Sequence, residues 1–413
     1  MIKFDKFVLN NGLKVIVHKD ITTPIVAVNL LYNVGAKDED PDKTGFAHLF
    51  EHLMFGGSIN IPLYDKPLLI AGGENNAFTS NDLTDYYITI PKENLETAFW
   101  LESDRMLSLA FSEKRLEVQK GVVIEEFKQR YLNQPYGDIF LLLRPLAYKK
   151  HPYQWATIGK EISHIAEATL TDVKDFFFRY YAPNNAILTV AGNVETEHIK
   201  QLAEKWFSPI EKRNIAPRNL PQEPIQTKAR KLSVERDVPF DAIYKAYHMC
   251  NRLNPAFYSV DLISDILSGG QSSRMHINLV KSKRLFSSID AYITGSMENG
   301  LFLIAGTLME GVKMIDAEAA IDEELSKMFT EKVTDYELNK VKNKIESVHE
   351  FSQMSVLNKA MNIATHELIG KAEDINMELA KYLDVSINSI QENSKQLFRP
   401  ENCSTLYYHS KNH

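Results

Sequence analysis

Three titratable residues lie within five positions of an otherwise apolar segment, TGFAHLFEHLMFGGS (residues 44–58). In a helix, side chains four residues apart lie on the same face, so His48 and His52 can point toward one site, with Glu51 beside them. Two neutral imidazoles at this spacing supply half of a tetrahedral zinc site, and a neighbouring carboxylate can accept the proton of a water molecule. The order His-x-x-Glu-His is the inverse of the commoner zinc-protease motif. The segment therefore predicts a catalytic zinc site.

The alternative interpretation is a pair of buried structural histidines with Glu51 exposed to solvent. The flanking residues are strongly apolar, and uncompensated polar groups in such a helix would be costly unless something ligates them. A catalytic zinc also needs a third protein ligand. In EVQKGVVIEEFKQR (117–130), two carboxylates interrupt an apolar helical pattern. Glu125 and Glu126 are both candidates, and the spacing alone leaves the choice between them open.

The chain that must position these residues has 413 residues, 44% of them hydrophobic and 24% charged. This length suits two domains of about 200 residues, each with its own core. Four prolines lie among charged residues in SPIEKRNIAPRNLPQEPIQ (208–226), a composition that favours an extended connector. We therefore expect a zinc-bearing catalytic unit at 1–207, a proline-rich linker at 208–227 and a homologous unit without a metal site at 228–413.

Both halves show the same coarse order of elements. Each opens with strand patterns, continues through a helix to a further pair of strands, and then becomes mainly helical. The clearest strand patterns are FVLNNGLKVIVHK, IVAVNLLYNVG, NNAFTSNDLTDYYITIP and NAILTVAG in the first half, and DAIYKAYHM, SIDAYITGS and GLFLIAGTL in the second. We expect an α+β protein made of two homologous α/β units, each an antiparallel-rich sheet with helices packed on one side.

Charge and composition exclude several classes of protein. The formal net charge of −7 argues against a general nucleic-acid or acidic-membrane binder, which needs a basic face. No segment approaches the roughly 18 uninterrupted apolar residues of a membrane span. The start, MIKFDKFVLNNGLKVIVHKD, has no apolar signal core. The sequence as written predicts a cytoplasmic protein, and a periplasmic or organellar location only if a leader has been removed.

Beyond the histidine motif, the sequence resembles a known family over both halves, in order. GAKDEDPDKTGFAHLFEHLMFGGS, GGENNAFTSNDLTDYYITIP, VVIEEF, YYAPNNAILTVAGNV and ILSGGQSSRM are similar to segments of the inverted-motif zinc peptidases. That family contains pitrilysin, insulin-degrading enzyme, the mitochondrial processing peptidase and half-length bacterial relatives. The resemblance implies paired homologous α/β units, in agreement with the duplication. It also implies a zinc-dependent endopeptidase that cleaves unfolded peptides or small polypeptides in an enclosed chamber.

The resemblance assigns roles to individual residues. His48 and His52 match the two histidine ligands, and Glu126 matches the third ligand, which implies one Zn²⁺ per chain. Glu51 matches the general base that takes a proton from the water activated by zinc and passes it to the leaving amine. Gln119 occupies a position, seven before the third ligand, where the family often has glutamate. We expect this uncharged side chain to tune the catalytic site.

The resemblance also identifies a substrate-binding strand. By residue match, Asn76, Ala77 and Phe78 line the peptide substrate, which the family takes as an added strand on a sheet edge. Backbone pairing of this kind tolerates many peptide sequences. The alternative is an ordinary sheet edge without a ligand.

One departure from the family concerns the second half. Many members carry an arginine and a tyrosine seven residues apart, opposite the zinc, and here the matching positions are Lys281 and Ser288. Some bacterial relatives divide the work between a zinc-bearing subunit and a metal-free partner with the Arg/Tyr pair. We therefore expect a dimer in which this chain is the zinc-bearing subunit and a metal-free homologue carries that pair. The rival interpretation is a catalytically silent assembly or peptide-binding subunit of the same family.

Overall fold

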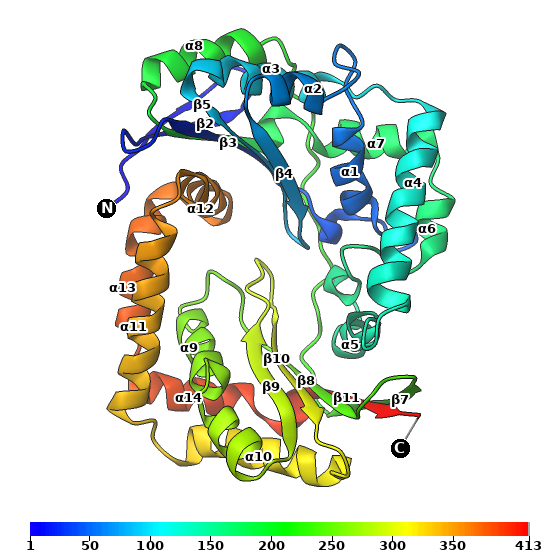
Figure 1. The fold of residues 1–413 in the computed structure, drawn as a ribbon, viewed down its shortest axis with the longest axis vertical. Coiled ribbons are helices and arrows are strands. Elements are labelled where there is room, and N and C mark those ends of the chain that lie inside the picture. The colour runs from blue at the N-terminus through cyan, green and yellow to red at the C-terminus, as the bar shows by residue number, and fades with distance from the viewer. Residues whose placement is uncertain (412–413) are drawn as a thin grey trace. The chain divides into compact units, whose positions relative to one another are not determined.

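The computed structural model describes residues 1–411 and divides the chain into two compact units, each built around one sheet (Figure 1). Unit 1 contains Met1–Gln129, Trp155–Leu220 and Glu350–Met377. Unit 2 contains Arg130–Gln154, Pro221–His349 and the chain from Glu378 onward. Each half of the sequence therefore contributes a segment to the unit formed mainly by the other half.

The sheet of unit 1 has six strands in the order β1-β2-β6-β3-β5-β4. All neighbouring pairs are antiparallel except β2 and β6. The central strand β3 has the sequence IVAVNLLY and is buried on both faces, whereas the edge strand β4 is open to solvent at every second residue. The strands are β1 (Asp5–Val8), β2 (Lys14–Lys19), β3 (Ile25–Tyr32), β4 (Glu74–Thr79), β5 (Thr84–Pro91) and β6 (Ala186–Gly192).

The sheet of unit 2 repeats this topology with five strands in the order β7-β11-β8-β10-β9. Without β1, the order of unit 1 is β2-β6-β3-β5-β4, and each of these strands has a counterpart at the same place in unit 2. The parallel pair is also repeated, because β7 and β11 are parallel. The strands are β7 (Arg230–Arg236), β8 (Ala242–His248), β9 (Phe286–Ile293), β10 (Leu301–Leu308) and β11 (Cys403–Ser410). The repeated order confirms the predicted fold class of two similar antiparallel-rich units.

Helices cover both faces of the unit 1 sheet (Figure 1). Helices α3 and α8 pack on one face, and α12 packs on the other against β3 and β6. The contact under α12 is made by small side chains, since Val356 and Ala360 pack on Ala27 and Ala191. The helices of unit 1 are α1 (Phe46–Phe55), α2 (Asp65–Ile70), α3 (Leu95–Leu107), α4 (Glu113–Phe127), α6 (Ile162–Ala166), α7 (Leu170–Tyr180), α8 (Thr196–Phe207) and α12 (Val356–Ile369).

The sheet of unit 2 is covered in the same way. Residues of α9, α10 and α14 form the main core with one face, while α5 packs on β7, β8 and β11. Leu143 and Ala147 of α5 contact Ala246 and Leu406 in a separate cluster. The helices of unit 2 are α5 (Ile139–Ala147), α9 (Phe257–Ser268), α10 (Met314–Thr330), α13 (Glu378–Leu383) and α14 (Ile387–Leu397), and α11 (Asp335–Ser352) runs from unit 2 into unit 1.

The two halves thus exchange one helix each. Helix α5 belongs to the first half of the sequence and covers the unit 2 sheet, and α12 belongs to the second half and covers the unit 1 sheet. This differs from the expectation of helices on one side of each sheet. The physical reason is visible in β3, whose apolar residues on both faces need cover on both sides. The bounds of the two compact units therefore differ from the predicted domains at 1–207 and 228–413.

The proline-rich segment has no helix or strand from residue 211 to 227, but it is held by hydrogen bonds. The guanidinium of Arg213 donates to the carbonyls of Phe177 and Tyr181 at 3.0 and 2.8 Å in unit 1. In unit 2, Gln226 Nε2 donates to the carbonyl of Cys403 at 2.8 Å. The connector therefore follows the surface of both units. Among the described residues, no helix has the length and apolar character needed to cross a membrane.

Candidate metal centre

Helix α1 carries the histidine motif on one partly open face. Six of its ten residues, all apolar, are buried, whereas His48, Glu51 and His52 are intermediate in exposure. The apolar residues fix the helix in the core of unit 1, and their spacing leaves the three polar side chains on the remaining face. The local sequence therefore both buries the helix and presents its titratable groups.

The N-terminus of α1 is capped from a distance by Glu39. Gly45 precedes the helix with φ at 89°, a conformation that favours glycine. The carboxylate of Glu39 accepts the N–H of Gly45 at 2.9 Å, the N–H of Ala47 at 2.8 Å and the indole N–H of Trp155 at 3.0 Å. Burial raises the pKa of Glu39 to about 8, although these three donors favour the charged form. This buried carboxyl group anchors the helix that bears the histidines.

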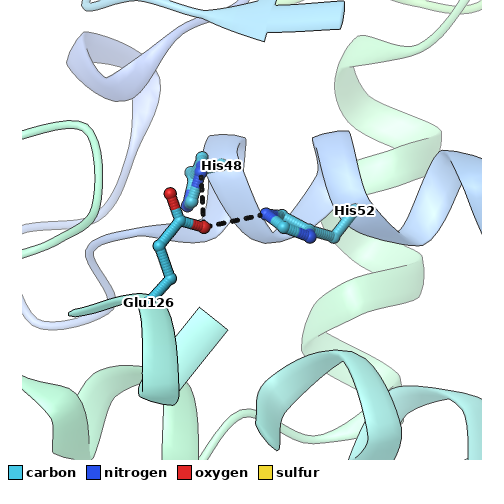
Figure 2. A group of neighbouring side chains, drawn as sticks. All are labelled: His48, His52 and Glu126. Atoms are coloured by element: carbon cyan, nitrogen blue, oxygen red, sulfur yellow. Dashed lines mark ion pairs between the residues drawn. The ribbon is translucent and has the colours of Figure 1, made fainter. Parts of the chain in front are cut away.

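Helix α4 presents Glu126 to α1. The helix begins after Ser112, whose hydroxyl accepts the N–H of Arg115 at 3.3 Å, and it packs directly on α1. Of the two adjacent carboxylates, Glu125 is exposed and accepts a hydrogen bond from Lys128 at 2.7 Å. Glu126 is partly buried and faces the histidines (Figure 2). The structure therefore brings Glu126 to the histidine pair and leaves Glu125 on the solvent side.

Three potential ligand atoms converge at this site (Figure 2). Glu126 Oε2 lies 3.3 Å from His52 Nε2 and 3.6 Å from His48 Nε2, and all three atoms lie within 4.8 Å of one another. Zinc bonds of about 2.0–2.1 Å in tetrahedral geometry place ligand atoms about 3.3 Å apart. Two imidazole nitrogens and one carboxylate oxygen at these distances fit a three-ligand zinc site. Within residues 1–411, this is the one group of three His, Cys, Asp or Glu side chains that converges in this way.

Glu51 is tied to the edge strand of the sheet. The hydroxyl of Thr79, the last residue of β4, donates to Glu51 Oε2 at 2.6 Å. The distance is typical of a hydroxyl bound to a carboxylate. Sequence reasoning missed Thr79 because a hydroxyl in a strand is common and its partner lies 28 residues away. Glu39 was missed too, because a carboxylate in the charged run AKDEDPDK suggests a solvated loop.

Gln119 lies two helical turns before Glu126 on α4 and is partly buried. With Leu53, Leu116, Val173 and other residues, it lines a cavity of about 20 Å³, which is space for about one water molecule. The structure thus places Gln119 at a small pocket next to the C-terminal part of α1.

The predicted substrate residues lie on a sheet edge, the position that the family resemblance implied. Asn76, Ala77 and Phe78 belong to β4, which pairs with β5 on one side only. Asn76 and Phe78 are exposed, and Ala77 is partly buried. The side chain of Asn76 accepts the backbone N–H of Ala77 at 2.8 Å.

The two positions that depart from the family pattern belong to unit 2. Lys281 lies in a π-helical segment, His276–Ser282, and Ser288 lies on β9. Neither side chain can supply the planar, bidentate contacts of an arginine or the phenol of a tyrosine.

Comparison with known proteins places the chain in a family. The profile "Insulinase (Peptidase family M16)" matches residues 14–159, and the profile "Peptidase M16 inactive domain" matches residues 167–345. The zinc protease PqqE of Helicobacter pylori is 29% identical over 418 residues, which cover 98% of this chain and 92% of that protein. The mitochondrial-processing peptidase subunit beta of Saccharomyces cerevisiae is 25% identical over 358 residues, covering 82% and 76% of the two chains.

A solved structure supports the same assignment. The crystal structure of a protease from Helicobacter pylori superposes with a TM-score of 0.93 at 28% sequence identity and covers 99% of this chain and 100% of that one. Fold and site together define a two-unit protein with an inverted His-x-x-Glu-His helix. The chain belongs to the pitrilysin family, peptidase family M16, and this confirms the resemblance seen in the sequence.

Proposed function

We propose that this chain is a zinc-dependent endopeptidase acting on unfolded peptides or small polypeptides. The observation that carries the proposal is the convergence of His48, His52 and Glu126 within 4.8 Å, with Glu51 on the same helix. Three ligand-type side chains that converge from two helices, with a fourth titratable group on the same helix as the histidines, have no structural purpose as simple as ligation of a metal. The zinc proteases among the relatives support the same reaction class.

The residues take distinct roles in this proposal. His48, His52 and Glu126 would hold one zinc ion per chain, and a bound zinc ion lowers the pKa of a water molecule and polarises a carbonyl group. Glu51 accepts the proton of the attacking water and returns it to the leaving amine. Gln119 adjusts the surroundings of Glu126 without adding charge.

The peptide binds along β4 in the same proposal. An extended segment that adds to the open edge forms backbone hydrogen bonds near Asn76, Ala77 and Phe78, and these bonds do not depend on the peptide's side chains. The position of β4 at the edge of the unit 1 sheet supports this role. Cleavage inside an enclosed chamber, as the family resemblance implies, would select chains that are short or flexible.

We further propose that the chain is the zinc-bearing subunit of a hetero-oligomer. Lys281 and Ser288 replace the Arg/Tyr pair in unit 2, so a homologous, metal-free partner would supply that pair. One of the relatives is itself named as a subunit, the beta subunit of the mitochondrial processing peptidase.

Metal content and peptide cleavage, measured on one preparation, test the proposal. The purified chain should contain about one zinc, the number for a single three-ligand site, and a quenched fluorescent peptide should be cleaved in a chelator-sensitive way. Cleavage that appears only after a metal-free homologue is added supports the hetero-oligomer, and full activity of the chain alone contradicts it. Absence of zinc, or zinc without cleavage in the presence of the partner, would contradict the peptidase and favour a catalytically silent subunit.

A further inference from the structure

Thr79 connects two parts of the candidate site that lie in separate segments of the sequence. It is the last residue of β4, the strand proposed to bind the peptide, and its hydroxyl donates to Glu51 Oε2 at 2.6 Å. Glu51 lies on α1, which packs beside β4. A single hydrogen bond therefore links the substrate strand with the proposed general base.

The geometry of β4 directs Thr79 toward α1. Side chains alternate between the two faces of a strand, so Ala77 and Thr79 share one face, whereas Asn76 and Phe78 lie on the other. Ala77 pairs with Tyr86 of β5, and the hydroxyl of buried Tyr86 donates to the carbonyl of Phe50 in α1 at 3.5 Å. The face that carries Thr79 is therefore the face covered by α1.

The turn after β4 holds Thr79 in place. Ser80 N–H donates to the carbonyl of Leu83 at 2.9 Å, and Ser80 Oγ accepts the N–H groups of Asp82 and Leu83 at 3.1 Å each. A buried ion pair of 2.9 Å joins Asp82 to Lys37. The end of β4 is thus fixed at several points, and a fixed hydroxyl can orient its partner at little further entropic cost.

We infer that Thr79 is a positioning residue, which holds the Glu51 carboxylate in the orientation needed for proton transfer and couples that orientation to the strand that takes the peptide. The inference rests on the proposed function. It adds that the hydroxyl acts in turnover more than in peptide affinity, because it donates to the carboxylate of the proposed base.

Three variants separate this role from a general effect on the sheet. Thr79→Val keeps the shape and β-branching of the side chain and removes the hydroxyl, whereas Thr79→Ser keeps the hydroxyl. Thr89→Val makes the same change on β5, on the other face of the sheet, at a partly buried position paired with Glu74. Each variant is compared with wild type for kcat, KM, zinc content and Tm.

Loss of the Thr79 hydroxyl should lower kcat and leave KM and zinc binding almost unchanged. Thr79→Val is expected to lower kcat by about tenfold or more, as for loss of a hydrogen bond to a charged group, with KM within about twofold and zinc content unchanged. Thr79→Ser should recover most of kcat, and Thr89→Val should match wild type. The inference is overturned if Thr79→Val turns over at the wild-type rate, or if Thr79→Ser is as slow as Thr79→Val.

A second measurement tests the contact between Thr79 and Glu51 and does not depend on peptide cleavage. Denaturant unfolding of the metal-free protein is compared for wild type, Thr79→Val, Glu51→Ala and the double variant. If the two side chains interact, the double variant should be less destabilised than the sum of the single variants. Additive effects overturn the inference. Non-additive effects in a wild-type chain that cleaves no peptide, either alone or with a metal-free homologue, leave the contact standing and contradict the proposed function instead.

Discussion

Helices α1 and α9 occupy the same place in two units of the same topology, yet their polar residues serve different purposes. Each helix follows the central strand of its sheet and precedes the edge strand. In α1, His48 and His52 converge on a carboxylate from α4. In α9, Asp261 accepts the hydroxyl of Tyr382 at 2.6 Å, and Asp265 accepts a hydrogen bond from Lys344 at 2.7 Å.

The difference shows that the shared topology places a helix beside an edge strand in both units. The chemistry then depends on the few polar side chains that each helix does not bury. The acidic groups of α9 are used to hold neighbouring elements of unit 2 together. This agrees with the match of residues 167–345 to a profile described as an inactive domain.

The N-termini of the two helices differ as well. The turn that leads into α9 is held locally, because the side chain of Asn254 accepts the N–H of Ala256 at 2.9 Å. The N-terminus of α1 depends on Glu39 and its hydrogen bond from Trp155, far apart in the sequence. The helix with the histidine pair is therefore held partly through Trp155, which is 116 residues from Glu39, whereas the turn before α9 is held by a contact between near neighbours.

The largest effect is expected for the proposed third ligand, which a comparison of two adjacent glutamates tests. Glu126→Ala should weaken zinc binding by at least about a hundredfold, since loss even of groups that support the ligands costs tenfold to a hundredfold, and cleavage should disappear with the metal. Glu125→Ala, one residue away and exposed, should keep both. Zinc titration against a competing chelator measures the effect. Equal losses in both variants would contradict the placement of Glu126.

A slightly smaller effect is expected for the proposed base. Glu51→Gln should reduce kcat by about a hundredfold to ten-thousandfold, the usual contribution of general base catalysis, with zinc still bound. Asp261→Asn makes the equivalent change on α9 and should leave kcat within about twofold of wild type. Metal analysis and initial rates on the same samples test both statements. Comparable losses in the two variants would break the functional distinction between the units.

The smallest effect concerns the pH dependence of stability through Glu39. Its pKa is raised from 4.5 to about 8 in the folded protein, so the folded state binds the proton more tightly than the unfolded state. Its contribution to stability is therefore complete below about pH 4.5 and is lost as the pH rises to about 8. Glu39→Gln cannot titrate, so its Tm should fall less than that of wild type between pH 5 and pH 8. Parallel curves of Tm against pH for the two proteins would contradict the raised pKa of Glu39.

Much of this organisation is predictable from the sequence, and the rest depends on tertiary contacts. The spacing of His48 and His52 is a local property of a helix, and repeated strand patterns reveal the duplication. The choice of Glu126 over Glu125 needed the family resemblance, because both fit the helix. Thr79 gains its role from a partner brought close by folding, and the role of Glu39 depends on its burial and on Trp155, which is 116 residues away. Similarly, the pattern of α12 predicts a helix and contains no information about which sheet the helix covers.

The helix exchange between the two halves has a consequence for protein synthesis. A ribosome completes the strands of unit 1 at residue 192, but residues 356–369, which cover Ala27 and Ala191, are translated much later. The N-terminal unit therefore emerges first and is finished nearly last, with one apolar sheet face open in the meantime. During that interval a nascent chain is exposed to misassociation and suited to protection by a chaperone.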